Sequence, residues 1–139
     1  MSWLLDTCVV SELGRKRPDR RVLRWMRDAQ DDLQFLSVLT LGELRKGAAK
    51  AADPARREAI RRWIDEEIAV TFSDAILPVD LAVAERWGSL CGEAERRGRP
   101  RPAIDALLAA TALVHGLTLV TRNVSDVEWT GVLVFNPFD

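Results

Sequence analysis

The sequence holds few of the side chains from which many metal and thiol sites are built. It contains one histidine and two cysteines, which excludes a site made of several histidines, and Cys8 and Cys91 do not form a disulfide framework. No apolar run reaches the roughly 18 residues that a membrane-spanning helix requires. The first residues show no basic leader followed by a long apolar segment, so we expect no signal peptide and a reducing cytoplasm as the compartment.

The overall charge is also small. Twenty basic and 21 acidic residues leave a net charge of −1, so any attraction for nucleic acid must come from local patches. Hydrophobic residues make up 47% of the 139 residues, which is ordinary for a globular protein. A chain of this length can bury its own core, and we expect residues 1–139 to form a single domain.

Short strand patterns alternate with helical ones along the chain. Strands are predicted at residues 3–6, 33–39, 75–79, 117–121 and 132–135, and helices at 8–13, from Pro18, at 40–51, from Pro54, after Asp80 and at 103–115. Residues 122–130 are predicted to be a loop. This order indicates an α/β fold with a mainly parallel central sheet and helices on both faces. In such sheets, ligands bind beyond the carboxyl ends of the strands.

Acidic side chains follow these predicted strands. Asp6 ends the first strand, Glu43 opens the helix after the second, and Asp105 lies in the first turn of the helix at 103–115. Asn123 and Asp126 come just after the strand at 117–121. Because these positions meet at one edge of a parallel sheet, the five side chains are predicted to line one pocket.

Each acid also has a purely structural interpretation. Thr40 and Glu43 fit the capping box S/T-x-x-E, in which the glutamate returns a hydrogen bond to the backbone of the threonine. Asp6 fits a helix cap, Asp105 favours a helix dipole, and Asp126 fits a turn. Taken singly, these interpretations stay open. Taken together, independent caps have no reason to follow strands that lie side by side, which favours a shared site.

Several carboxylates in one pocket require a cation. Two unit charges about 5 Å apart at an effective dielectric of about 20 repel by roughly 3 kcal/mol. Oxygen ligands select the hard ions Mg²⁺ or Mn²⁺ over zinc. His115 fits a helix end, and both cysteines fit core thiols. A site without a histidine base or cysteine nucleophile suits phosphoester hydrolysis by a metal-activated water.

A basic segment precedes Asp105. The sequence RRGRPRP at 96–102 carries Arg96, Arg97, Arg99 and Arg101. These arginines are predicted to bring a polyanion to the acidic edge, and Arg122 is predicted as a further RNA contact. A solvated loop is the alternative interpretation.

Four stretches together resemble a known family. LLDTCVVSE, LSVLTLGELRKG, AIDALLAATALVHGLTLVTRN and VFNPFD, in this order and spacing, resemble PIN-domain ribonucleases, and among them the VapC and FitB-like toxins of bacterial toxin–antitoxin pairs. The resemblance covers essentially the whole chain. It implies a three-layer α/β/α fold, endonucleolytic cleavage of RNA, and Mg²⁺ or Mn²⁺ bound by Asp6, Glu43 and Asp105. Thr7 and Ser11 carry over as nearby hydroxyl groups.

Two positions depart from the family pattern. Members often have Asn where this chain has Cys8, so one polar support of the site is expected to be lost. The fourth acidic position is Asn123, whose amide oxygen can coordinate a metal but carries no charge, so Asp126 is the candidate to replace it. Whether one or two ions act is left open. A non-catalytic PIN-like module with a depleted acidic site is therefore the alternative function.

The resemblance also implies partners. It implies a homodimer and a small VapB-like antitoxin whose C-terminal segment docks near the active site, with the possibility of a higher toxin–antitoxin assembly and no membrane partner. The helices that carry Trp25, Trp63 and Trp87 can supply such surfaces. Core packing of each tryptophan is the other interpretation.

Overall fold

The computed structural model describes residues 1–139 and is built around a five-stranded sheet of order β3-β2-β1-β4-β5. The strands are β1 (Ser2–Leu5), β2 (Leu33–Ser37), β3 (Ile76–Leu77), β4 (Thr118–Val120) and β5 (Val134–Phe135). All four pairings are parallel, with Leu4 of β1 opposite Phe35 of β2 and Leu119 of β4. The carboxyl ends of the strands therefore share one edge, as predicted.

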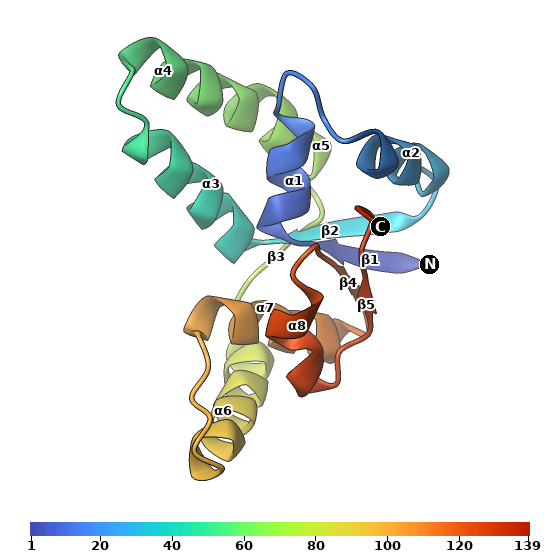
Figure 1. The fold of residues 1–139 in the computed structure, drawn as a ribbon, viewed down its shortest axis with the longest axis vertical. Coiled ribbons are helices and arrows are strands. Elements are labelled where there is room, and N and C mark those ends of the chain that lie inside the picture. Colours follow the sequence, from blue (N-terminus) through green and yellow to red (C-terminus); the bar gives the residue numbers. More distant parts are fainter.

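Helices cover both faces of the sheet (Figure 1). One face carries α1 (Thr7–Leu13), α2 (Arg20–Asp28), α3 (Val38–Lys50), α4 (Pro54–Trp63), a π-helical turn (Ile64–Ile68) and α5 (Ala69–Thr71). The other carries α6 (Leu81–Arg96), α7 (Ala103–His115), α8 (Val124–Val127) and a 3₁₀ turn (Glu128–Thr130). This arrangement confirms the three-layer α/β/α prediction. None of the helices combines the length and apolar character that crossing a bilayer demands.

The sheet separates two hydrophobic clusters. Leu5 and Ile64 belong to the larger cluster, whereas Leu4 and Leu119 belong to the smaller one under α7 and α8. Neighbouring residues of a strand point to opposite faces, which is why Leu4 and Leu5 serve different cores. Trp25 and Trp63 pack against the larger cluster, which supports core packing for both.

Three local predictions were wrong. The third helix begins at Val38 with Ser37 as its cap, because β2 ends two residues earlier than predicted. Pro18 lies outside α2, which begins after the cap Asp19. The segment 122–130 is not a plain loop, since it contains α8 and the 3₁₀ turn. The caps Asp53, Asp80 and Gly116 were predicted correctly.

Gly14 allows α1 to pack closely on α4. A Cβ at Gly14 would lie 2.9 Å from a ring carbon of Trp63. We therefore expect Gly14→Ala to lower the free energy of unfolding by about 1–3 kcal/mol, the usual cost of overpacking. Urea unfolding measures this change. Gly42→Ala is the matched control, because its Cβ meets nothing within 4 Å in α3 and should stabilise by about 0.5–1 kcal/mol. Equal effects of both changes would contradict the close contact.

Candidate active site

Asp6 is fixed at the carboxyl end of β1 by its backbone and its side chain. Its N–H donates to the carbonyl of Val120 in β4 at 2.9 Å. One carboxylate oxygen accepts the N–H of Thr7 at 2.7 Å and caps α1, while the other accepts the hydroxyl of Thr121 at 2.6 Å. Asp6 is thus a helix cap and also a carboxylate at the sheet edge, so the two interpretations of this residue are compatible.

Glu43 is held from the neighbouring helix. It lies in the second turn of α3, and its Oε1 accepts the hydroxyl of Thr7 at 2.7 Å. The capping box with Thr40 was wrong, because Thr40 is buried inside α3 and its Oγ1 lies 3.4 Å from Thr7 Oγ1 as a hydrogen-bond acceptor. Thr7 therefore links the carboxylate of Glu43 to the start of α1, immediately after Asp6.

The pKa of Asp105 reflects its burial and the nearby acids of the site. Partial burial in the first turn of α7 raises the pKa of this carboxyl, and the negative charges of Asp126, Asp6 and Glu43 raise it further. No Lys or Arg forms an ion pair with any of these four carboxylates. The edge of the sheet is therefore a region of uncompensated negative charge.

Asn123 and Cys8 occupy the two positions that depart from the family pattern. Asn123 is exposed before α8, and its N–H donates to Thr121 Oγ1 at 3.0 Å. The Cys8 thiol lies 3.3 Å from Asp6 Oδ2, so this position still gives the carboxylate a weak donor. Burial, followed by the charge of Asp6, raises the pKa of Cys8 to about 11, which keeps the thiol protonated.

The donor set suits a hard cation, although it is not a tight cage. Carboxylate and amide oxygens are the ligands that Mg²⁺ and Mn²⁺ prefer. No three His, Cys, Asp or Glu side chains lie close enough together to hold one ion by themselves. Mg²⁺ commonly keeps several waters and binds through one or two carboxylates, so the residues present fit a loosely held, partly hydrated ion.

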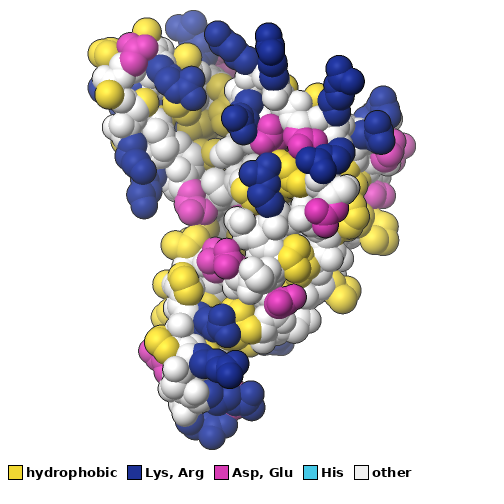
Figure 2. All heavy atoms as spheres, in the orientation of Figure 1, with side chains coloured by type: hydrophobic (Ala, Val, Ile, Leu, Met, Phe, Trp, Pro, Cys, Tyr) yellow, Lys and Arg dark blue, Asp and Glu magenta, His cyan; other side chains and the backbone are white.

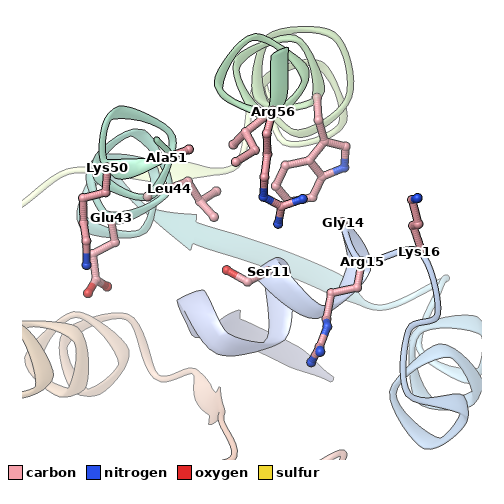
Figure 3. A pocket seen from close by; sticks show the side chains of 12 residues that line it. Ser11, Gly14, Arg15, Lys16, Glu43, Leu44, Lys50, Ala51 and Arg56 are labelled. Atoms are coloured by element: carbon pink, nitrogen blue, oxygen red, sulfur yellow. The ribbon is translucent and has the colours of Figure 1, made fainter. Parts of the chain in front are cut away.

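A cavity of about 540 Å³ adjoins Glu43 between α1, α3 and α4 (Figure 3). Ser11 and Glu43 lie on its walls, and Leu44, Ile60 and Trp63 give it an apolar lining. Its remaining charged lining is basic: Arg15, Lys16, Lys50 and Arg56. Ser11 therefore lines the same cavity as Glu43, and its role as a supporting hydroxyl stays a prediction.

The predicted basic contacts fall into different environments. Arg96 and Arg97 both pair with Glu93 at the end of α6, at 2.6 and 3.1 Å. Arg101 lies over the Trp129 ring, 5.0 Å from its centroid. Figure 2 shows Lys and Arg side chains gathered over the lower tip, where α6 ends, and over the upper helices, with acidic side chains on the surface between them.

Arg122 lies beside β4 rather than in that basic loop. Its guanidinium is 3.8 Å from the Phe138 ring centroid and 3.9 Å from Glu12, and its backbone N–H donates to Cys8 Sγ. Glu12 is 5% exposed and also accepts the N–H of Asp19 at 2.9 Å. Half of the Arg122 side chain remains exposed.

Sequence reasoning missed two residues that organise this edge. Thr121 is buried and joins Asp6 to Asn123 through one hydroxyl. Glu12 is a buried acid in the opening motif and orients Arg122. A threonine after an apolar strand, such as Thr121, indicates only the end of the strand. An acid in a helical segment, such as Glu12, is usually exposed, so neither role had a local indication in the sequence.

Comparisons with known proteins agree with this architecture. The family model described as PIN domain matches residues 3–125. VapC ribonuclease Y4jK of Sinorhizobium fredii is 33% identical over 136 residues, covering 98% of this chain and 97% of the relative. Toxin FitB of Neisseria gonorrhoeae is 34% identical over 135 residues, 97% of each chain.

Solved structures share the whole fold. FitAcB from Neisseria gonorrhoeae superposes with a TM-score of 0.88 at 34% identity, covering 98% of both chains. A toxin–antitoxin complex from Klebsiella pneumoniae contains a chain with a TM-score of 0.70 at 25% identity, covering 99% of both chains. The chain belongs to the PIN domain family, among the VapC ribonucleases and FitB toxins.

Proposed function

We propose that this protein is a Mg²⁺- or Mn²⁺-dependent endoribonuclease that acts as the toxin of a toxin–antitoxin pair. The observation that carries the proposal is the set of four carboxylates at one sheet edge, none paired with Lys or Arg. Partial burial raises the pKa of Asp105, and the charges of the other three raise it further. Charge of this kind, left uncompensated by the protein, is what a divalent cation neutralises.

The residues of the site divide into ligands and supports. Asp6, Glu43 and Asp105 are the proposed ligands, with Asn123 or Asp126 completing the set. When bound, the ion supplies a water of lowered pKa and neutralises charge on the phosphate. Thr7 holds Glu43, as the 2.7 Å hydrogen bond indicates. Such supporting hydrogen bonds orient metal ligands.

Charge around the acidic edge fits an RNA substrate. Positive side chains lie on either side of the acids, over the upper helices and at the tip of α6 (Figure 2). A polyanion held by both groups crosses the carboxylates between them, where the ion offsets the local repulsion. Phosphate contacts of this kind position a strand without reading its bases, so they leave the cut site to be found by experiment.

The antitoxin is the proposed protein partner. The named toxin FitB and the toxin–antitoxin complex among the similar proteins support this assignment. The cavity beside Glu43 is lined by both apolar and basic side chains, which suits a peptide segment with apolar and acidic residues. A segment seated there would cover Glu43 and block the site.

Metal dependence of RNA cleavage is the test. Protein freed of any copurifying antitoxin is incubated with a panel of labelled RNAs in Mg²⁺, in Mn²⁺ or in EDTA, beside Asp6→Asn purified identically. Cleavage that requires the ion and is lost in the variant is the expected result. Equal cutting by both proteins would reveal a contaminant. The absence of a preformed metal cluster and the neutral Asn123 favour one rival, a non-catalytic binding module, and a lack of cutting across the panel would support it.

A further inference from the structure

We propose that the cavity between α6, the segment 97–101 and the 3₁₀ turn binds a phosphate of the RNA strand outside the scissile bond. The cavity has a volume of about 630 Å³, and Arg97, Arg99, Arg101 and Trp129 line it together with Glu93, the carboxylate that pairs with Arg97. This inference rests on the proposed ribonuclease function, since it assigns a position to the substrate of that site. Of the arginines predicted to contact RNA in the basic loop, it assigns the phosphate chiefly to those that form no ion pair within the protein.

The arginines of this segment differ in their partners. Arg97 shares the carboxylate of Glu93 with Arg96, so much of its charge is already neutralised. Arg99 and Arg101 form no ion pair with any acid of the chain. The backbone N–H of Arg99 donates to the carbonyl of Ala94 at 2.8 Å, which ties this residue to the end of α6. Two unpaired guanidinium groups therefore face one cavity from an anchored segment.

Arg101 carries a second indication of a missing ligand. Its Nε is buried and has no hydrogen-bond partner in the protein. A buried donor without an acceptor is costly, and a bound anion would satisfy it once the guanidinium turns to expose Nε, because this atom has almost no accessible surface. The guanidinium lies over Trp129, which fixes its plane. Because a guanidinium presents a planar set of donors, this arrangement suits the oxygens of a phosphate.

Trp129 connects the cavity to the acidic edge. Its indole N–H donates to the backbone carbonyl of Asp126 at 2.9 Å, so the wall of the cavity is attached to a proposed member of the metal site. Arg101 also precedes α7, which carries Asp105 in its first turn. A strand with its scissile phosphate at the acids can therefore place a neighbouring phosphate in the cavity, which favours RNA over an unrelated acidic ligand.

The test compares RNA binding by charge-removing variants of the full chain. The affinity of a fluorescein-labelled single-stranded RNA of about 12 nucleotides is measured by anisotropy over a series of KCl concentrations in EDTA. We expect Arg99→Gln/Arg101→Gln to raise Kd about tenfold and to reduce the salt slope by about 1.4, the value for two lost contacts on a single strand. Arg86→Gln, which removes one exposed charge from α6 outside the cavity lining, should bind as wild type. The single variant Arg99→Gln is measured as well, because replacing the half-buried Arg101 can disturb folding, whereas replacing the exposed Arg99 should not.

Cleavage kinetics separate this inference from the proposed function. In Mg²⁺, the double variant should show a raised KM with unchanged kcat. Wild-type Kd and salt slope in the double variant would overturn the phosphate site while leaving the nuclease intact, and so would an equal loss in Arg86→Gln. Loss of antitoxin binding with RNA binding retained would also overturn it, in favour of a protein ligand. Arginine-dependent RNA binding by a protein that cuts nothing would support the site and reject the proposed activity.

Discussion

Replacing Asp105 with asparagine is expected to reduce metal-dependent RNA cleavage at least 100-fold and to raise the melting temperature of the metal-free protein. The change removes a proposed ligand, and charge stabilisation by a bound ion is worth several kcal/mol, about tenfold in rate for each 1.36 kcal/mol. It also removes a charge repelled by Asp126, Asp6 and Glu43. Because Asp105 is partly exposed and solvent screens the repulsion, we expect a modest rise of about 1–4 °C.

The pH dependence of Asp105 follows from the direction of its shift. Its pKa is raised in the folded protein, so above that pKa the ionised carboxylate lowers folding stability, and stability increases as pH falls through the folded pKa towards the unfolded value. Stabilisation by Mg²⁺ has the opposite trend, since the ion binds the ionised form. Thermal unfolding with EDTA and with Mg²⁺ across a pH series measures both. Asp105→Asn should make both the folding stability in EDTA and the stabilisation by Mg²⁺ less dependent on pH.

A matched control separates the local effect from net charge. Asp74→Asn removes the same charge from an exposed turn away from the acids and should change neither cleavage nor the response to Mg²⁺. If Asp105→Asn lowered the melting temperature in EDTA, the carboxylate would be a stabilising cap of α7. If it cut RNA as wild type does, the metal site would have to be built from other residues.

The order of elements was predictable because each strand and helix has a local signature. The apolar run before Asp6 and the αL glycine after His115 mark their boundaries without reference to the rest of the fold. Parallel strands then oblige the residues that follow them to meet at one edge. That rule predicted Asp6 and Glu43 at one edge, whereas Asp105 opens a helix and does not directly follow a strand.

Boundaries failed where two local signals compete. Ser37 and Thr40 both fit the cap of the third helix, and only the glutamate three residues after Thr40 favoured the later start. The chain uses Ser37, because the strand ends there and Thr40 is required inside against Thr7. Because Ser37 caps the helix, Glu43 is not needed as part of the cap, and its carboxylate is available to the site. The missed α8 is four residues long, too short for a periodic pattern.

Contacts between distant residues were beyond sequence reasoning. The cysteine expected to weaken the site gives Asp6 a thiol neighbour instead. The role of Thr121 depends on a partner 115 positions away, and no spacing rule connects them. The pairing of Arg96 and Arg97 with Glu93 is different, because it is local, at i,i+3 and i,i+4, and the helical spacing of these charges could have predicted it. The contacts of Cys8 and Thr121 depend on side-chain geometry and tertiary packing, which composition and periodicity do not encode.

Replacing Thr121 with valine is expected to lower Mg²⁺ affinity, and with it cleavage at limiting Mg²⁺, by about 10–100-fold, the usual effect of losing a hydrogen bond to a metal ligand. The hydroxyl donates to Asp6 Oδ2 at 2.6 Å and accepts the N–H of Asn123 at 3.0 Å. Valine has the same shape but no hydroxyl, so Asp6 and the start of α8 lose their common anchor. The concentration of Mg²⁺ that gives half-maximal cleavage is the measurement.

Two variants show whether the hydroxyl is responsible. Thr121→Ser keeps it and should retain affinity for Mg²⁺ within a fewfold range, even if the lost methyl group costs about 1 kcal/mol of stability. Thr111→Val makes the same change at a buried threonine whose hydroxyl donates to the carbonyl of Leu107 at 2.8 Å within α7, and it should leave the Mg²⁺ dependence unchanged. If Thr121→Val kept the wild-type dependence, the orientation of Asp6 would not limit metal binding. If serine failed as fully as valine, the hydroxyl alone would not be sufficient to orient Asp6, because serine keeps the hydroxyl and lacks only the methyl group that valine retains.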